Sequence, residues 1–241
     1  MRIISLGLGV QSTAMYLMSS LGYIDRADYA IFADPGAELP DTYKLWDYLN
    51  DWAKYNKGIP LIKKKKSLYK DIIKGQNSTG QRWASIPAFG ESGGMIRRQC
   101  TKEYKIDVVV KEIRKLHGLK KYQRMKESRL PNITYEYPLI DNRITRSECI
   151  KFLEERSFHD VKKSSCVFCP YHNNTQWRYI KQNYPEEWIK IIQVDAAIRD
   201  SSKRGKDDQL YLHRTLEPIN EAYLQEDQED LFMCEEGYCG I

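Results

Sequence analysis

Short apolar runs alternate with longer amphipathic segments along the first half of the chain. The apolar runs at residues 2–6, 29–33 and 59–62 predict three buried strands. Between them, residues 13–18 and 42–55 predict helices, because their apolar positions recur at helical spacing. Strands that alternate with helices indicate an α/β fold, in which a parallel twisted sheet carries helices on both of its faces.

The second half of the chain is predicted to be mostly helical. Thr145 followed by Glu148 matches a capping box, in which each side chain hydrogen-bonds to the backbone of the other residue. Residues 137–140 are predicted as a short extended piece. Further helices are predicted at residues 67–74, 101–116, 147–156, 175–184 and 186–200. We therefore expect an α/β domain at residues 1–140 and a helical C-terminal part at residues 141–241.

Two segments have a composition of their own. Residues 76–94 are rich in glycine, serine and asparagine, and a connection of this length predicts either a functional lid or a poorly ordered loop. Residues 63–66 are consecutive lysines, which we expect to form a solvated strand end.

The overall composition fits a cytoplasmic protein with an anionic ligand. Apolar residues make up 41% of the 241 positions, which is enough for a core. No apolar run of about 18 residues predicts a membrane span, and no secretory pattern begins the sequence. The net charge of +5 fits a nucleotide, and it would also fit a nucleic acid.

The six cysteines carry the metal or redox chemistry that the sequence offers. Disulfides are rare in the cytoplasm, so these residues are expected to be buried apolar side chains, ligands or redox thiols. Cys166 and Cys169 are spaced to chelate one centre from a tight turn. This spacing leaves an iron–sulfur cluster, a zinc ion and free thiols open.

The first strand opens through two glycines into a helix. Gly7 and Gly9 allow the backbone to approach a phosphate closely, and the N–H groups of the first helical turn point toward it. The segment lacks the Gly-Lys-Ser/Thr of common nucleoside triphosphatases and the third glycine of the dinucleotide fingerprint. It therefore predicts an anion site of another kind.

Four motifs occur in order along the chain: the glycine turn at residues 5–12, the Asp-Pro-Gly segment at 32–43, the Cys-Thr-Lys segment at 98–106 and Pro-Leu-Ile at 138–140. Together they resemble the adenine-nucleotide alpha-hydrolase superfamily, also called PP-loop proteins, and within it the phosphoadenylyl-sulfate (PAPS) reductase-like family. The resemblance covers about residues 3–170. It implies a PP-loop, Rossmann-like sheet that binds an adenine nucleotide, namely PAPS, adenylyl sulfate (APS) or ATP.

The resemblance also implies site residues. Cys239 or Cys100 would supply a thiolate nucleophile, and Lys105 would neutralise charge on the leaving phosphate. Two departures from the family pattern are visible: Gln11 replaces the aspartate of ATP-cleaving relatives, and Cys239 lacks the glutamate and histidine that flank the reductase cysteine. The implied nucleotide contacts are Ser5, Gly7, Gly9, Gln11, Ser12, Asp34, Gly36, Arg98, Lys102 and Arg124.

For the cysteines, the resemblance implies a four-iron four-sulfur cluster. Reductases of adenylyl sulfate hold such a cluster with an adjacent cysteine pair and a later Cys-x-x-Cys. Cys166 and Cys169 match the later pair, whereas Cys100 stands alone where the adjacent pair is expected. Cys149 and Cys239 are predicted to complete the four ligands, and zinc held by the same ligands is the alternative.

Three functions follow from the resemblance. The first is a PAPS reductase-like oxidoreductase, in which a thiolate takes the sulfur from the nucleotide and a thiol reductant such as thioredoxin releases sulfite. The second is an ATP-dependent sulfur-transfer enzyme that modifies nucleic acid, which the basic charge and the altered C-terminal motif favour. The third is a nucleotide-binding module without turnover.

Overall fold

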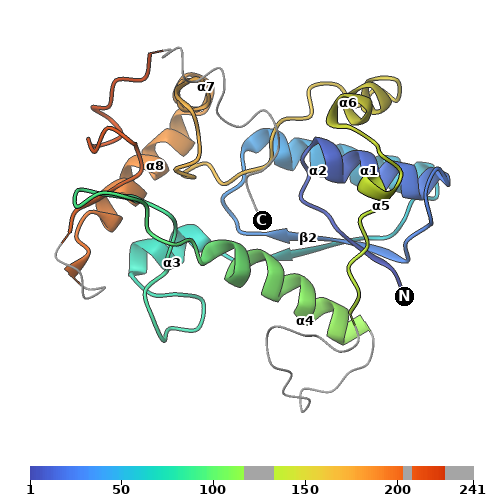
Figure 1. Cartoon of the computed structure of the whole chain (residues 1–241), viewed down its shortest axis with the longest axis horizontal. Coiled ribbons are helices and arrows are strands. Elements are labelled where there is room, and N and C mark those ends of the chain that lie inside the picture. The colour runs from blue at the N-terminus through green and yellow to red at the C-terminus, as the bar shows by residue number, and fades with distance from the viewer. Residues whose placement is uncertain (117–132, 203–207, 226–241) are drawn as a thin grey trace. The chain divides into compact units, whose positions relative to one another are not determined.

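The computed structural model describes residues 1–116, 133–202 and 208–225, which fall into two compact units (Figure 1). Unit 1 comprises Met1–Asp34, Pro40–Lys65 and Tyr104–Ser164, and unit 2 comprises Pro35–Leu39, Lys66–Glu103 and Ser165–Ile241. This division differs from the expected boundary between residues 140 and 141. The reason is that the helix following residue 140 packs against the first helix of the chain.

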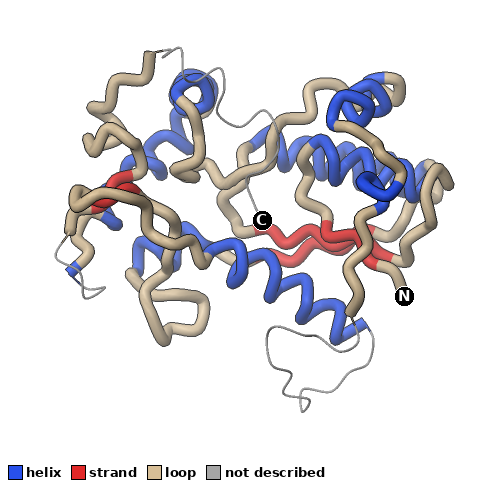
Figure 2. The backbone as a smooth tube through the Cα atoms, in the orientation of Figure 1, coloured by secondary structure: helices blue, strands red, loops and turns tan. Residues whose placement is uncertain are grey.

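A parallel three-stranded sheet organises unit 1. Its strands are β1 (Ile3–Ser5), β2 (Tyr29–Asp34) and β3 (Leu61–Lys65), and they lie side by side in the order β1-β2-β3 (Figure 2). In the register, Ala30 pairs with Ile4 on one side and with Leu61 on the other. The predicted alternation of parallel strands and helices is confirmed, and β3 continues through the lysines to residue 65 instead of ending at residue 62.

Helices cover both faces of this sheet, as predicted. α1 (Val10–Leu21) and α2 (Pro40–Tyr55) lie on one face, where α6 (Arg146–Glu154) packs against α1 (Figure 1). α4 (Asp107–Leu116) covers the other face and contacts β2. α2 begins two residues earlier than expected, because a proline is tolerated in the first helical turn, where its missing N–H has no partner to lose.

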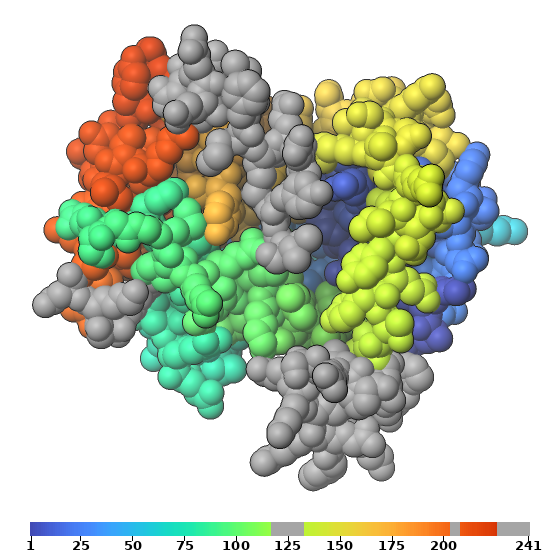
Figure 3. Space-filling view, in the orientation of Figure 1, coloured from blue at the N-terminus to red at the C-terminus, as the bar shows by residue number. Residues whose placement is uncertain are grey.

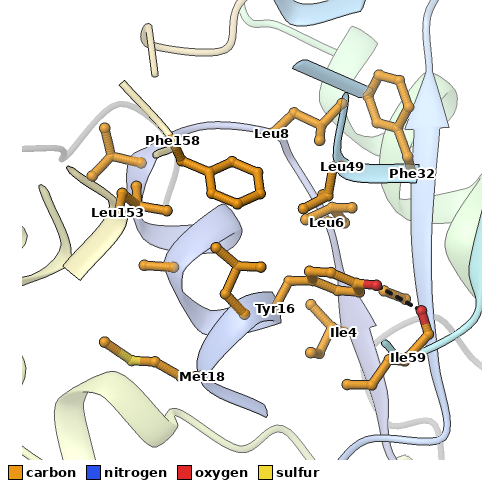
Figure 4. Packing of buried hydrophobic residues seen from close by; sticks show 14 of the residues in the cluster. Ile4, Leu6, Leu8, Tyr16, Met18, Phe32, Leu49, Ile59, Leu153 and Phe158 are labelled. Carbon is orange, nitrogen blue, oxygen red and sulfur yellow. Dashed lines mark hydrogen bonds between the residues drawn. The ribbon is translucent and has the colours of Figure 1, made fainter. Parts of the chain in front are cut away.

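The side chains of β2 alternate between these two layers. Phe32 belongs to the cluster with α1 and α2, whereas Ile31 packs against Val108 of α4. Figure 4 shows the larger cluster, in which the Tyr16 hydroxyl donates a hydrogen bond of 2.7 Å to the carbonyl oxygen of Ile59. Tyr16 is fully buried, and this burial raises its pKa to about 12.

The segment before α6 lies against the N-terminal residues of unit 1 (Figure 3). Arg2 forms an ion pair of 3.3 Å with Glu136. Further along, α5 (Pro138–Asp141) is a helical turn and not the predicted extended piece. Pro138 occupies the first helical position, where its fixed φ suits a helix, so the prediction of an extended piece is wrong.

The lysines at residues 63–66 include the end of β3, where Lys63 and Lys65 are exposed as expected, but several of them also have partners in the protein. Lys63 and Lys64 point to opposite faces of the sheet, as successive strand residues do. Lys64 forms an ion pair of 3.2 Å with Glu112 of α4. Lys66, in unit 2, donates a hydrogen bond of 2.8 Å to the carbonyl oxygen of Glu103.

Unit 2 combines helices with a short antiparallel strand pair. Trp177 and Trp188 pack edge to face where two of these helices meet, with their ring centres 6.4 Å apart. None of the described helices, in either unit, has the length and apolar character needed to cross a membrane. The sequence predicted the helices of unit 2 to within a few residues, but it predicted neither of the two strands of this unit. The elements are α3 (Leu68–Lys74), α7 (Asn174–Asn183), α8 (Pro185–Ile198), β4 (Phe89–Gly90) and β5 (Leu210–Tyr211).

Candidate functional site

The turn between β1 and α1 carries the features of an anion site in unit 1. Leu8 adopts a left-handed backbone conformation, with φ of 60°, and its side chain is buried. The first helical hydrogen bond runs from the N–H of Thr13 to the carbonyl oxygen of Gly9 at 3.0 Å. The N–H groups of residues 10–12 therefore lie ahead of the helical hydrogen-bond ladder, where an anion is favoured.

Packing within unit 1 does not explain the two glycines of this turn. A Cβ atom at Gly7 would lie 3.6 Å from Ser12 Oγ, and one at Gly9 would lie 3.6 Å from the backbone nitrogen of Ser164. Both are ordinary contact distances. The Ser12 hydroxyl accepts the N–H of Gly9 at 3.2 Å, so the turn is closed by its own serine. Glycine has no side chain, and phosphate-binding turns use this property to let an anion approach the backbone closely.

Asp34 ends β2 at the same edge of the sheet as this turn, because β1 and β2 are adjacent and parallel. Its side chain is fully buried and accepts a hydrogen bond of 2.8 Å from the Tyr43 hydroxyl. The ammonium of Lys63 lies 3.5 Å from the same carboxylate. At this edge unit 1 gathers the predicted contacts Ser5, Gly7, Gly9, Gln11, Ser12 and Asp34.

Cys166 and Cys169 occupy one tight turn in unit 2. The N–H of Cys169 donates to the carbonyl oxygen of Cys166 at 3.0 Å, and the N–H of His172 donates to the carbonyl oxygen of Cys169 at 3.0 Å. Both cysteines are half-buried thiols. The buried His172 ring places Nε2 2.9 Å from the Cys166 carbonyl oxygen and Nδ1 3.2 Å from Gln176. The histidine therefore holds the backbone of the turn.

The segment after β2 packs against the cysteine turn within unit 2. Glu38 and Cys166 form an antiparallel bridge, and the N–H of Val167 donates to the carbonyl oxygen of Ala37 at 2.7 Å. Gly36 lies just before this bridge with φ of 70°, a conformation that favours glycine. A predicted nucleotide contact and two predicted metal ligands are thus neighbours in unit 2.

The segment around Cys100 contacts the chain just beyond the same turn. The guanidinium of Arg98 lies 5.9 Å from the ring centre of Tyr171, which follows Cys169 by two positions. Cys100 is a half-buried thiol. Unit 2 therefore brings Arg98, a predicted nucleotide contact, to the neighbourhood of the cysteine turn.

A buried carboxylate orders the connection Gln76–Gly94. Glu103 accepts hydrogen bonds from the Ser78 N–H at 3.1 Å and from the Ser78 hydroxyl at 2.7 Å, and it pairs with Arg82 at 3.0 Å. Arg82 also donates to the side chain of Gln99. Burial by itself raises the pKa of Glu103, but the hydrogen bonds from Ser78 and the charge of Arg82 outweigh it, so the pKa is lowered.

The structure describes two of the four remaining predicted residues. Lys102 is exposed in unit 2. Lys105 is half-buried in unit 1, in the π-helix η1 (Thr101–Ile106) that leads into α4. Arg124 and Cys239 are outside the residues that the structure describes.

The surroundings of the cysteines test whether the predicted metal centre fits. Cys149 is fully buried in the hydrophobic core of unit 1, and burial raises its pKa, which disfavours the thiolate that metals bind. In unit 2, the buried hydroxyl of Ser165 has no hydrogen-bond partner among the described residues. Within those residues no group of three or more His, Cys, Asp or Glu side chains is placed to hold a metal ion. The turn thus fits a two-thiol anchor, Cys166 and Cys169, and not a complete ligand set.

Sequence reasoning missed Lys63 and Glu103. The signal for Lys63 is strand parity, because it falls on the same face of β3 as Leu61, which packs against the core beneath α2. No local signal marks Glu103, because its partners Ser78 and Arg82 lie more than 20 positions away.

The described residues thus contain a glycine turn at the start of α1 in unit 1 and a two-thiol turn in unit 2. Both turns contain residue types that the sequence resemblance implies. No protein-family model, curated protein or solved structure matches the chain.

Proposed function

We propose that the protein is a PAPS reductase-like enzyme that binds an adenine nucleotide at the turn between β1 and α1. The observation that carries this proposal is the turn itself, in which Leu8 is left-handed and a 12-residue helix starts at the carboxyl edge of a parallel sheet. Backbone N–H groups and the dipole at a helix start favour a phosphate. Ligands of parallel α/β sheets bind beyond the carboxyl ends of the strands.

A buried hydroxyl on α1 supports a polar ligand near this turn. Thr13 is fully buried, and its Oγ1 has no hydrogen-bond partner among the residues that the structure describes. An unsatisfied buried hydroxyl costs about 1–3 kcal/mol. A ligand oxygen at the helix start, or a water ordered by it, is the kind of group that would satisfy Thr13.

The thiols support sulfur chemistry on the nucleotide, with Cys100 or Cys239 as the nucleophile. In the proposed reaction the thiolate attacks the sulfur of the phosphosulfate group, and the sulfur–oxygen bond to phosphate breaks. The nucleotide leaves with the electron pair of that bond. A thiol of the reductant then attacks the enzyme sulfur, sulfite leaves, and the second thiol of the reductant resolves the mixed disulfide.

A cysteine-ligated centre at the turn in unit 2 is the second part of the proposal. Cys166 and Cys169 would hold a four-iron four-sulfur cluster or a zinc ion, and whichever of Cys100 and Cys239 is not the nucleophile is a further candidate ligand. The Ser165 hydroxyl, which lies beside Cys166 in the sequence, is available to donate to a bound sulfur. When bound, a cluster would supply one-electron redox chemistry, and a zinc ion would supply a structural cross-link.

Product analysis tests the reaction. Purified protein incubated with PAPS and reduced thioredoxin should release sulfite. AMP and pyrophosphate formed from ATP and Mg²⁺ would instead support the ATP-dependent sulfur-transfer enzyme, and tight binding without either product would support a binding module. A protein that binds none of these nucleotides would contradict all three functions.

A carboxylate placed at the turn tests the binding site. Gly9→Glu puts a negative charge ahead of α1, and we expect the dissociation constant for PAPS or ATP to rise about 30-fold, or roughly 2 kcal/mol. Tyr55→Glu is the matched control, because Tyr55 is 87% exposed at the last position of α2. Calorimetry measures both variants, and equal affinities would place the nucleotide elsewhere.

A further inference from the structure

The ammonium of Lys63 lies against aromatic rings in unit 1, although Lys63 is an exposed residue in a run of lysines. Its ammonium lies 4.7 Å from the ring centre of Tyr43 and 5.6 Å from the ring centres of Phe32 and Trp46. It also lies 3.5 Å from Oδ2 of Asp34, so this contact is an ion pair and not a hydrogen bond. The ring faces and the carboxylate together hold the ammonium in one place.

The positive charge of Lys63 compensates the buried carboxylate of Asp34. Its side chain is 0% exposed, and the Tyr43 hydroxyl donates to Oδ1 at 2.8 Å. A buried ionised carboxylate is strongly disfavoured unless a cation compensates it. Lys63 provides such a cation, and Tyr43 joins the pair by donating to the carboxylate and facing the ammonium.

The place of Asp34 in the sheet makes its compensation matter for a ligand. Asp34 ends β2, which lies one strand spacing, roughly 5 Å, from the strand that leads into the Gly7–Ser12 turn. An uncompensated carboxylate there would repel the phosphate that the start of α1 attracts. With Lys63 in place, this edge of the sheet keeps the positive potential of the helix start.

We infer that Lys63 is a positioning residue of the anion site in unit 1. It neutralises Asp34, and through Tyr43 it holds the start of α2 against the end of β2. The inference rests on the proposed function, because it concerns the binding of the phosphate groups of a nucleotide. It assigns no contact between Lys63 and the ligand.

Lys64 provides a matched control on the same strand. Its ammonium pairs with Glu112 at 3.2 Å on the opposite face of the sheet, and its side chain is 38% exposed. The Lys63 side chain is 31% exposed, so the two residues are similarly placed with respect to solvent. Lys63→Met and Lys64→Met remove the same charge from the same strand, and only the first leaves Asp34 without its ammonium partner.

Calorimetry with ATP and with inorganic pyrophosphate measures the effect on binding. We expect Lys63→Met to weaken both affinities about tenfold and Lys64→Met to change them less than about twofold. Asp34 is itself a predicted nucleotide contact, so the effect of adding Asp34→Asn to Lys63→Met is measured without ligand, by hydrogen exchange. Lys63→Arg keeps the charge and should bind like the wild type.

Hydrogen exchange of the protein without ligand separates this inference from the proposed function. Lys63→Met should speed exchange of the amides at residues 43–47, the added Asp34→Asn should slow it again, and Lys64→Met should leave it unchanged. If the wild type binds neither probe but the variants show this exchange pattern, the proposed nucleotide binding fails and the role of Lys63 at α2 stands. Unchanged exchange and affinity in Lys63→Met, or no recovery of the exchange rate with Asp34→Asn, would overturn the inference.

Discussion

Tyr16 in unit 1 and Glu103 in unit 2 are both buried polar residues that join segments far apart in the sequence. The Tyr16 hydroxyl bonds the carbonyl oxygen of Ile59 inside a cluster of apolar side chains. Glu103 accepts hydrogen bonds from Ser78 and pairs with Arg82, beside a long connection. The apolar surroundings favour the neutral form of Tyr16, whereas the hydrogen bonds favour the charged form of Glu103.

The difference shows how each unit depends on its polar groups. In unit 1 the sheet and helices bury a continuous set of apolar side chains, so the loss of one hydroxyl leaves most of the packing in place. In unit 2 the connection Gln76–Gly94 contains a single two-residue strand, and one carboxylate ties its first part to the chain around Cys100. The stabilisation from Tyr16 in unit 1 is therefore lost at alkaline pH, and that from Glu103 in unit 2 is lost at acidic pH.

Glu103→Ala is expected to have the largest effect on stability. The change removes the acceptor of Ser78 and the partner of Arg82, and we expect a loss of about 3 kcal/mol at pH 7. The folded-state pKa is lowered from 4.5, so this stabilisation is present above pH 4.5 and is lost as pH falls through the lower folded value. Denaturant unfolding at pH 7 and pH 3 measures it, and an equal loss at both values would contradict the account.

Tyr16→Phe is expected to cost less, about 1–2 kcal/mol, because it leaves the buried Ile59 carbonyl oxygen without its donor. The pKa of Tyr16 is raised from 10.0 to about 12, so its stabilisation is present below pH 10 and is lost as pH rises toward 12. Unfolding followed between pH 8 and pH 12 should show a shallower alkaline decline in the variant. A decline as steep as that of the wild type would mean that other groups govern it.

The smallest stability effects are expected at the cysteines, where the two units differ in chemistry. Cys149→Ser should cost about 1 kcal/mol, because it buries a hydroxyl in the core of unit 1. Cys166→Ser should cost less than about 0.5 kcal/mol at its half-buried position and should remove the metal from anaerobically purified protein. Metal analysis with unfolding curves compares the two variants. If Cys149→Ser loses the metal but unfolds like the wild type, Cys149 is a metal ligand, contrary to this expectation.

Periodicity predicts unit 1 because its elements are long enough to carry a pattern. The capping box predicted from Thr145 and Glu148 is confirmed: the Thr145 N–H donates to the Glu148 carboxylate at 2.7 Å, and the Glu148 N–H donates to the Thr145 hydroxyl at 3.2 Å. Parity along β2 likewise places Ile31 and Phe32 on opposite layers.

The strand pair of unit 2 and the pairing of Asp34 with Lys63 could not be predicted from the sequence. Their partners are distant along the chain, or the segments are too short to carry a pattern. β4 and β5 have two residues each, too few for any period, and they pair Phe89 with Tyr211 across more than 100 positions. The turn at Gly7 and Gly9 was found because glycines before a helix form a local signal. The compensation of Asp34 by Lys63 has no such signal, because it needs the fold to bring two strands together.

Leu8 has a consequence for the thermodynamics of the nucleotide binding that we propose at this turn. Its side chain is anchored in the core while its backbone holds a left-handed φ of 60°, so the packing of unit 1 sets the shape of the turn in advance. A preorganised loop loses little conformational entropy when a ligand arrives, and more of the contact energy then appears as affinity. Leu8→Gly would relieve the backbone strain and remove the buried side chain. The turn would then be flexible, and a ligand would have to order it on binding.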